Sequence, residues 1–239
     1  MRTRTGLKKL GKGLAGAIAI ASGTSAYGAV VVVNPPADIT NTAGGANTTT
    51  TWDVNSDGTA DFLFNNRYPN TTSGFGVVWQ QNMNPATAAL ATTNGVVSYL
   101  GPFVRYAFAL AAGVNVGPTN TNFSTVTQVV LGSQYLYGSV PYYYGGFAAG
   151  GPNGSVTPGT FAFVGFRFNA VDGTHFGYLR LAVNAGIIDF DNVGAMRAAY
   201  ESTPNTAILT GAVPEPGTMA LLALGAAGVV GAVVKRRRA

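Results

Sequence analysis

The sequence predicts an all-β protein, an antiparallel β-sandwich of jelly-roll type, that lies between two targeting segments. Its 33 glycines and 12 prolines separate short apolar and aromatic stretches, a spacing that favours strands joined by turns. These stretches do not alternate with helical patterns, which argues against a parallel α/β sheet. About 185 residues remain between the targeting segments, enough for one domain with a hydrophobic core.

The charges lie mostly at the two ends of the chain. Of 14 Lys and Arg, five lie in residues 1–12 and four in 235–238. The region between them has five arginines and nine acids, a net charge of 5 − 9 = −4. A nucleic-acid partner is not expected, because phosphate binding needs basic residues clustered on the folded domain. The chain has no cysteine, so its stability outside a cell must come from the core or from bound metal.

The first 28 residues have the pattern of a signal peptide that signal peptidase removes. Five basic residues precede the apolar stretch Leu14–Ala21, and the small residues Ala26 and Gly28 precede Ala29. Thr24-Ser25-Ala26 offers an alternative cleavage site. We therefore expect a signal peptide over 1–28 and an exported domain over 29–212.

The elements of the exported domain follow from local composition. The β-branched run Val30–Val33 is either a first strand or the flank of the cleavage site, and residues 40–51 are rich in Thr, Asn and Gly, which favours a loop or an edge strand. Helical turns are plausible at Pro85–Ala91 and at 195–202. Strands are predicted at Gly74–Gln80, Val96–Leu100, Phe103–Leu110 and Thr125–Leu131.

The clearest prediction is a hairpin over Phe161–Val183. Two apolar, aromatic-rich segments flank Asp172-Gly173, a pair typical of tight β-turns. The alternation places Phe166 and Phe168 on one face and Arg167 on the other.

Residues Asp53 to Asp61 form the one motif with specific metal chemistry. Asp53, Asn55, Asp57 and Asp61 occupy positions 1, 3, 5 and 9, Thr59 would offer its carbonyl, and Gly58 permits the sharp bend of a Ca²⁺ loop. Position 12 is Phe64 where an EF-hand has glutamate. The motif instead resembles the calcium loops of thrombospondin type 3 and integrin-type repeats, which implies a structural ion. The alternative is a solvated turn that leads into a strand.

Catalytic candidates are few, and we expect a non-catalytic protein. His175 is the single histidine and no cysteine is present, so we expect neither a zinc site nor a nucleophilic triad. Asp189 and Asp191 alternate with apolar residues, a pattern that allows a carboxylate pair for glycoside hydrolysis. An exposed strand face or a second cation site explains them better.

Five tyrosines fall within Tyr135–Phe147, three of them consecutive as Tyr142, Tyr143 and Tyr144. Tyrosine rings on a surface can stack on sugars, which makes these three candidate glycan-binding residues. The alternative is a loop on the sheet that contributes to the core and to self-association, which the neighbouring glycines favour slightly.

The tail from 213 to 239 has three parts in order: Pro214-Glu215-Pro216, the uncharged run Thr218–Val234, and the basic cluster Lys235–Arg238. Seventeen apolar or small residues span roughly 26 Å as a helix, enough for a thin bilayer. Basic residues directly after a span hold that end in the cytoplasm. The tail therefore predicts one transmembrane helix, with residues 29–212 outside the inner membrane.

These three parts together resemble the PEP-CTERM sorting signal of Gram-negative bacteria that make exopolysaccharide. The resemblance implies processing by the membrane enzyme exosortase and a final location at the cell surface or in the extracellular matrix of a biofilm. An uncut membrane anchor is the alternative. Phe163–Val183 also looks like the ectodomains that commonly carry this signal, which mostly have no assigned activity. We therefore expect a calcium-stabilised, exopolysaccharide-associated surface protein, or alternatively a carbohydrate-binding module.

Overall fold

A computed structural model describes residues 29–72, 74–101, 104–120, 122–126, 128–148, 156–192, 194 and 196–213. The predicted signal peptide, the Pro214-Glu215-Pro216 motif and the predicted transmembrane helix lie outside these residues. Within them, no helix is both long and apolar enough to cross a membrane.

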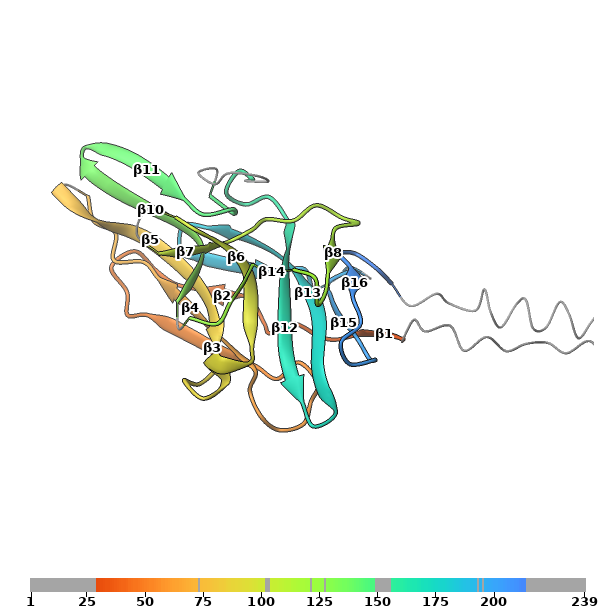
Figure 1. The fold of residues 1–239 in the computed structure, drawn as a ribbon. Coiled ribbons are helices and arrows are strands. Elements are labelled where there is room, and N and C mark those ends of the chain that lie inside the picture. The colour runs from red at the N-terminus through yellow and green to blue at the C-terminus, as the bar shows by residue number, and fades with distance from the viewer. Residues whose placement is uncertain are drawn as a thin grey trace, which may run out of the picture.

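The described chain is nearly all β, as the sequence predicts (Figure 1). Its only helical element is the 3-10 turn η1, Leu90–Thr92, which overlaps the end of the predicted helical turn at Pro85–Ala91. The first half of the chain provides β1 (Val30–Val32), β2 (Ile39–Thr40), β3 (Thr48–Trp52), β4 (Phe62–Arg67), β5 (Gly74–Pro85), β6 (Gly95–Leu100), β7 (Arg105–Ala107) and β8 (Asn115–Val116). The second half provides β9 (Phe123–Ser124), β10 (Val129–Gly138), β11 (Val140–Tyr144), β12 (Ala162–Ala170), β13 (Gly173–Asn184), β14 (Ile187–Phe190), β15 (Ala198–Glu201) and β16 (Ile208–Leu209).

Fourteen of these strands form one curled, mixed sheet. Its main path runs β1-β15-β13-β12-β6-β7-β10-β5-β4-β3, and β8 and β16 form a separate pair. The path has two halves, β1-β15-β13-β12 and β7-β10-β5-β4-β3. Strand β6 joins them, because Val96 pairs with β12 while Ser98 to Leu100 pair with β7. Two features differ from the predicted sandwich: the halves are continuous through β6, and β7 and β10 are parallel.

The core lies between the two halves of the curled sheet. Trp52 and Phe62 of one half meet Phe166 of the other, with ring centroids 5.3 and 5.4 Å apart. Phe64 and Phe190 make a similar edge contact at 4.9 Å. All five rings are buried, so aromatic contacts bind the halves together.

The predicted hairpin is confirmed as β12 and β13, with register from Ala162↔Leu181 to Ala170↔Gly173. Phe166 and Phe168 face the main core, whereas the Arg167 guanidinium lies 5.1 Å from the Phe123 ring on the other face. A second apolar cluster covers that other face. It consists of Val97, Val116, Phe163, Phe176, Tyr178, Ala199 and Ile208.

Two local predictions are wrong. The helical turn at 195–202 is strand β15 from Ala198 onward, because it pairs with β1 and β13. Residues 135–144 do not form a loop on the sheet but the hairpin of β10 and β11. This hairpin and the start of β5 form an arm that projects from the body (Figure 1).

Candidate functional site

The predicted calcium motif is the connection between β3 and β4, and its neck is closed by the Asp61 N–H, which donates to the Trp52 carbonyl at 2.9 Å. Ser56 and Gly58 have φ values of 60° and 90°, the left-handed region that sharp bends require. Asp53 accepts hydrogen bonds from the N–H groups of Asp57 and Gly58 at 3.2 and 2.8 Å. The loop therefore wraps around the Asp53 carboxylate.

Asp61 is the buried member of the loop, with 5% of its surface exposed. Its carboxylate accepts from the Val54 N–H at 2.9 Å and from Asn94 Nδ2 at 3.4 Å. Burial raises the pKa of Asp61 to about 6, and the charges of Asp53 and Asp57 act in the same direction. The carboxylates therefore lie near enough to repel each other.

Asp57 is exposed, and its pKa shifts in the opposite direction to that of Asp61. The Thr59 N–H, which donates to its carboxylate at 2.8 Å, lowers the pKa of Asp57, and the Asn55 amide at 3.0 Å adds to this. All five predicted ligands thus lie in one short loop. In the described part of the chain, no three Asp, Glu, His or Cys side chains are gathered closely enough to hold a metal ion.

The donor set nevertheless matches the chemistry of Ca²⁺, which prefers carboxylate, amide and carbonyl oxygens. In this structure the Asp53 and Asp57 oxygens face N–H groups of the loop itself. Coordination would use lone pairs that these bonds leave free, since each carboxylate oxygen can accept more than one bond. The assignment of calcium stays a prediction.

The three consecutive tyrosines do not share one face. They lie on β11, where successive side chains point to opposite faces. Tyr143 lies on the face of Trp79, with ring centroids 6.5 Å apart, whereas Tyr142 contacts Tyr137 and Tyr144 contacts Tyr135 on the other face. The structure therefore separates Tyr143 from Tyr142 and Tyr144.

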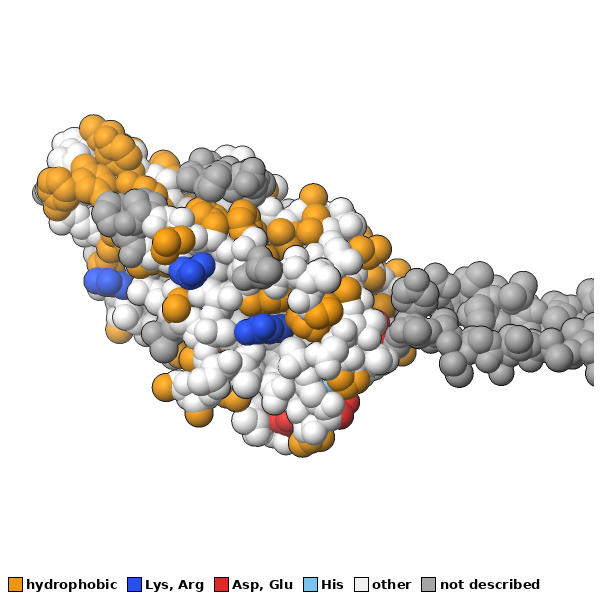
Figure 2. Space-filling model, viewed as in Figure 1, with side chains coloured by type: hydrophobic (Ala, Val, Ile, Leu, Met, Phe, Trp, Pro, Cys, Tyr) orange, Lys and Arg blue, Asp and Glu red, His pale blue; other side chains and the backbone are white. Residues whose placement is uncertain are grey.

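Exposure differs among them as well. Tyr142 and Tyr143 are 45% and 41% exposed, and Tyr144 is half-buried, stacked on Tyr106 at 6.2 Å. Phe75, 80% exposed, meets Tyr137 at 4.7 Å near the end of the arm. Apolar side chains gather over this arm in the space-filling view (Figure 2). The arm therefore presents an aromatic surface to solvent.

His175 is structural. It is 3% exposed and stacks on Phe168, with ring centroids 5.4 Å apart. Its Nδ1 lies 2.8 Å from the Glu201 carbonyl oxygen and its Nε2 lies 2.9 Å from Asp172 Oδ1. Both ring nitrogens are therefore engaged within the fold, and the residue ties β13 to β15.

Asp189 and Asp191 do not face each other across a cleft. Asp191 is paired with Arg180 and accepts a hydrogen bond from the Gly194 N–H at 3.1 Å. Burial raises the pKa of Asp189, and the charges of Asp38 and Asp191 add to the shift. Asp38 in turn accepts from the Phe190 N–H and the Asn192 amide. Asp38 and Asp191 therefore link β14 and the residues after it to neighbouring segments.

The last described residues close the domain. The Tyr178 hydroxyl donates to the Ala212 carbonyl, and Thr210 Oγ1 donates to the Ala111 carbonyl at 2.6 Å. The family model of the PEP-CTERM protein-sorting motif matches residues 212–238. The chain carries a PEP-CTERM sorting signal. This confirms the resemblance that the sequence predicted for the tail.

The PEP-CTERM signal marks the protein for export to the envelope or surface of a Gram-negative bacterium, as a substrate of exosortase. Its match begins at residue 212, whose carbonyl makes the last described hydrogen bond of the folded domain. The signal therefore follows the β domain without an intervening linker. No curated protein and no solved structure matches the chain at a significant level.

Proposed function

We propose that this PEP-CTERM protein is a non-catalytic component of the cell surface or extracellular matrix, associated with exopolysaccharide in a biofilm. Signal peptidase would remove residues 1–28, the inner membrane would hold the tail transiently, and exosortase would then process the chain near Pro214-Glu215-Pro216. The sorting motif at 212–238, directly behind a folded β domain, carries the proposal. Because the β domain ends where its sorting signal begins, removal of the tail would leave the whole folded domain to be released or attached to the surface.

Intact-mass measurement of the protein from the surface or extracellular fraction tests the processing step. The mature chain should begin near Ala29 and end near Pro216. A mature chain that still carries Lys235 to Arg238 would instead identify a plain membrane anchor. Substituting Pro214 and Pro216 by Ala should cause the unprocessed chain to accumulate in the membrane.

The proposal includes a structural calcium ion in the loop from Asp53 to Asp61. Three carboxylates in one short connection repel one another unless a cation lies among them. The raised pKa of Asp61, which its burial and then the charges of Asp53 and Asp57 produce, supports this reading. A bound cation would remove the cost of keeping Asp61 ionised inside the domain.

A second candidate function is carbohydrate binding through the tyrosines of the arm. The observation that favours it is the exposure of Tyr142 and Tyr143 on a strand that projects from the body. Retention of the purified protein on the exopolysaccharide of its own host tests it. Replacing Tyr142, Tyr143 and Tyr144 together by Ala should abolish retention.

The same triple variant separates binding from scaffolding through its melting temperature. Removal of exposed rings should change stability little, whereas loss of buried large aromatics costs roughly 3–5 kcal/mol each. Because Tyr144 is half-buried against Tyr106, we expect a moderate loss that comes mainly from that residue. Loss of retention together with several kcal/mol of stability in the Tyr142→Ala single variant would favour the scaffold.

A further inference from the structure

A hollow of about 350 Å³ opens between the two halves of the curled sheet, on the inner side of the arm. Trp79, Gln134 and Tyr143 form one wall, because Trp79 is paired with Gln134 across β5 and β10, and Gln134 with Tyr143 across β10 and β11. Residues in register across neighbouring strands point to the same face. The facing side comes from elsewhere in the chain and consists of Thr157, Pro158, Asn184 and Ala185.

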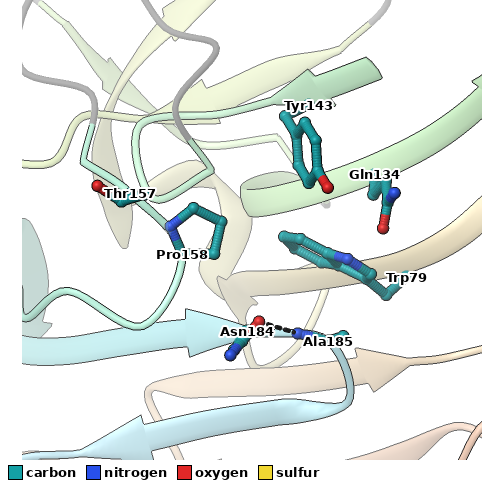
Figure 3. A pocket seen from close by; sticks show the side chains of 7 residues that line it. All are labelled: Trp79, Gln134, Tyr143, Thr157, Pro158, Asn184 and Ala185. Atoms are coloured by element: carbon teal, nitrogen blue, oxygen red, sulfur yellow. Dashed lines mark hydrogen bonds between the residues drawn. The ribbon is translucent and has the colours of Figure 1, made fainter. Parts of the chain in front are cut away.

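Figure 3 shows how these side chains converge. The Tyr143 ring and the Gln134 amide point toward the Trp79 indole from the arm, and Asn184 and Ala185 lie on the opposite side of the indole. Trp79 is 1% exposed, so its ring lies behind the lining and offers a ligand almost no surface, whereas Tyr143 is 41% exposed and borders the opening. The accessible aromatic surface of the hollow is therefore the Tyr143 ring.

The polar side chains of the lining are uncharged, and most of their hydrogen-bonding groups have no partner among the described residues. Within the described residues, the Gln134 side chain makes no hydrogen bond. Asn184 Oδ1 accepts from the Ala185 N–H at 2.8 Å, which fixes that amide at the turn and leaves its two Nδ2 hydrogens as donors. Gln134 supplies both a carbonyl acceptor and an amide donor from the other wall. Two primary amides therefore face one space that aromatic rings border.

We propose that this hollow binds a single ring of a neutral glycan. A sugar ring has an apolar face of C–H groups that can lie against an aromatic ring, and hydroxyl groups that both donate and accept hydrogen bonds around its edge. The two amides and the exposed Tyr143 ring match those two kinds of surface. The volume is at the low end of the range for small-molecule sites, about 300–1,000 Å³, which suits one ring rather than a long chain.

The lining argues against other ligands. Among the described residues, no charged side chain lines the hollow, so these residues offer nothing to compensate the charge of a phosphate or carboxylate group. An extended proline-rich peptide needs an open groove of several ring-sized pockets, whereas this hollow is a single space of about 350 Å³, which Pro158 and Asn184 line on the side opposite Tyr143. This inference rests on the proposed carbohydrate binding. It places the binding site on the inner face of the arm and not at the outer tyrosines Tyr142 and Tyr144.

The fluorescence of Trp79 provides a direct test with the exported protein. The chain has two tryptophans, and Trp52 is buried in the core with its indole N–H donating to the Asn34 carbonyl. Titration with the neutral disaccharides cellobiose, maltose and lactose into the millimolar range should shift the emission saturably for at least one of them. A poly-L-proline peptide, titrated in parallel, should have no effect.

Variants locate the site. Gln134→Ala and Asn184→Ala should each raise the Kd for the disaccharide about tenfold, because each removes hydrogen bonds to an otherwise buried hydroxyl. Gln134→Ala is the cleaner of the two, since its side chain holds no part of the described fold. Val140→Ala, at an exposed position on the outer face of β11, is the matched control and should leave the Kd unchanged.

The outcomes separate this proposal from the broader one. If Gln134→Ala and Asn184→Ala bind as wild type does, the hollow is not the site. If Tyr142→Ala alone loses retention on exopolysaccharide, the outer tyrosines bind glycan and the hollow does not. If the wild type binds neither the disaccharides nor the polysaccharide, both proposals are wrong. A shift of the Trp79 emission with poly-L-proline and with none of the disaccharides would mean that the hollow binds a peptide, and it would contradict the proposed sugar site.

Discussion

Asp61 links the calcium loop to the core. Its side chain is buried beside Val54 and Asn94, where it accepts hydrogen bonds from both. Asn94 Oδ1 also accepts from the Asn169 N–H at 3.0 Å, so the loop is connected through one asparagine to the β12–β13 hairpin. Asp61 is therefore connected by hydrogen bonds, through Asn94, to both halves of the sheet.

Calcium should raise the melting temperature of the purified domain. Binding to the folded state alone adds about 2.7 kcal/mol when the free ion is 100-fold above its Kd. Extracellular sites typically have a Kd of roughly 10⁻⁴ to 10⁻³ M, so millimolar Ca²⁺ should suffice in thermal unfolding after chelation. Mg²⁺ should act less, because it demands near-octahedral geometry.

Asp57→Ala is the matched variant, because this exposed side chain bonds only within the loop. It should melt close to the chelated wild type and lose most of the response to Ca²⁺. If wild type melts at the same temperature in chelator and in millimolar Ca²⁺, the motif is a turn without an ion.

The pKa of Asp61 predicts a pH dependence of stability in chelator. The folded pKa is about 6, raised by burial from 3.8, so the folded state binds more protons than the unfolded state between these values. Stability contributed by protonated Asp61 is thus complete below pH 4 and lost as the pH rises through 6, by up to about 3 kcal/mol.

Asp61→Asn should remove this share of the pH dependence, because the amide does not ionise. Chemical denaturation of both proteins at pH 4 and pH 6.5 measures the difference. Saturating Ca²⁺ should also reduce the loss in wild type, since a cation favours the ionised form. A wild type and variant that lose stability equally over this range would contradict the assignment.

At the scale of elements, the β12–β13 hairpin forms the centre of the fold. Phe166 of β12 contacts both Trp52 and Phe62 of the opposite half, and its cross-strand neighbour is Gly177. A side chain at Gly177 would meet the Phe166 ring at 2.4 Å. Glycine is therefore required there by close packing. The turn itself consists of Val171 and Asp172, and Gly173 opens β13 with a φ of 138°.

Phe166→Ala should lower the free energy of unfolding by about 3–5 kcal/mol, because it leaves a cavity between the two halves of the sheet. Urea denaturation monitored by tryptophan emission measures this, with Trp52 adjacent to the change. Phe75→Ala on the exposed arm is the control and should cost less than about 1 kcal/mol. Equal losses in the two variants would mean that the arm is packed in solution.

At the scale of the whole molecule, the first and last strands lie at one end of the domain (Figure 1). Strand β1 pairs with β15, and the Ala29 N–H donates to Ser202 Oγ at 2.9 Å. Strand β16 pairs with β8 to cover the second apolar cluster. Both predicted processing sites therefore adjoin the same end, where cleavage removes no strand of the folded domain.

Truncation should separate the sorting signal from the fold. A chain that stops after Val213 should keep the melting temperature of the processed protein, because the described contacts of the domain end at Ala212. A chain that stops after Thr206 loses buried Ile208 and Thr210, and we expect a loss of several kcal/mol. Differential scanning fluorimetry of both truncations checks this, and equal melting temperatures would contradict it.

The sequence by itself determined the features that depend on consecutive residues. The sorting signal, the Asp172-Gly173 hairpin and the loop from Asp53 to Asp61 are patterns of residue type at fixed spacing, and the structure forms the latter two as continuous segments. The all-β class follows from the same local patterning.

Only the tertiary structure decided which surfaces these segments share. The sequence around Tyr142 gave no signal that it pairs with Tyr135, and this register places Tyr143 beside Trp79 and Gln134. Nor did 195–202 indicate a strand, because Ala198 to Glu201 gain their β pairing only from β1 and β13. The hollow depends on residues 79, 134, 157 and 184, which meet because strands far apart in sequence pair and the sheet curls over its aromatic core.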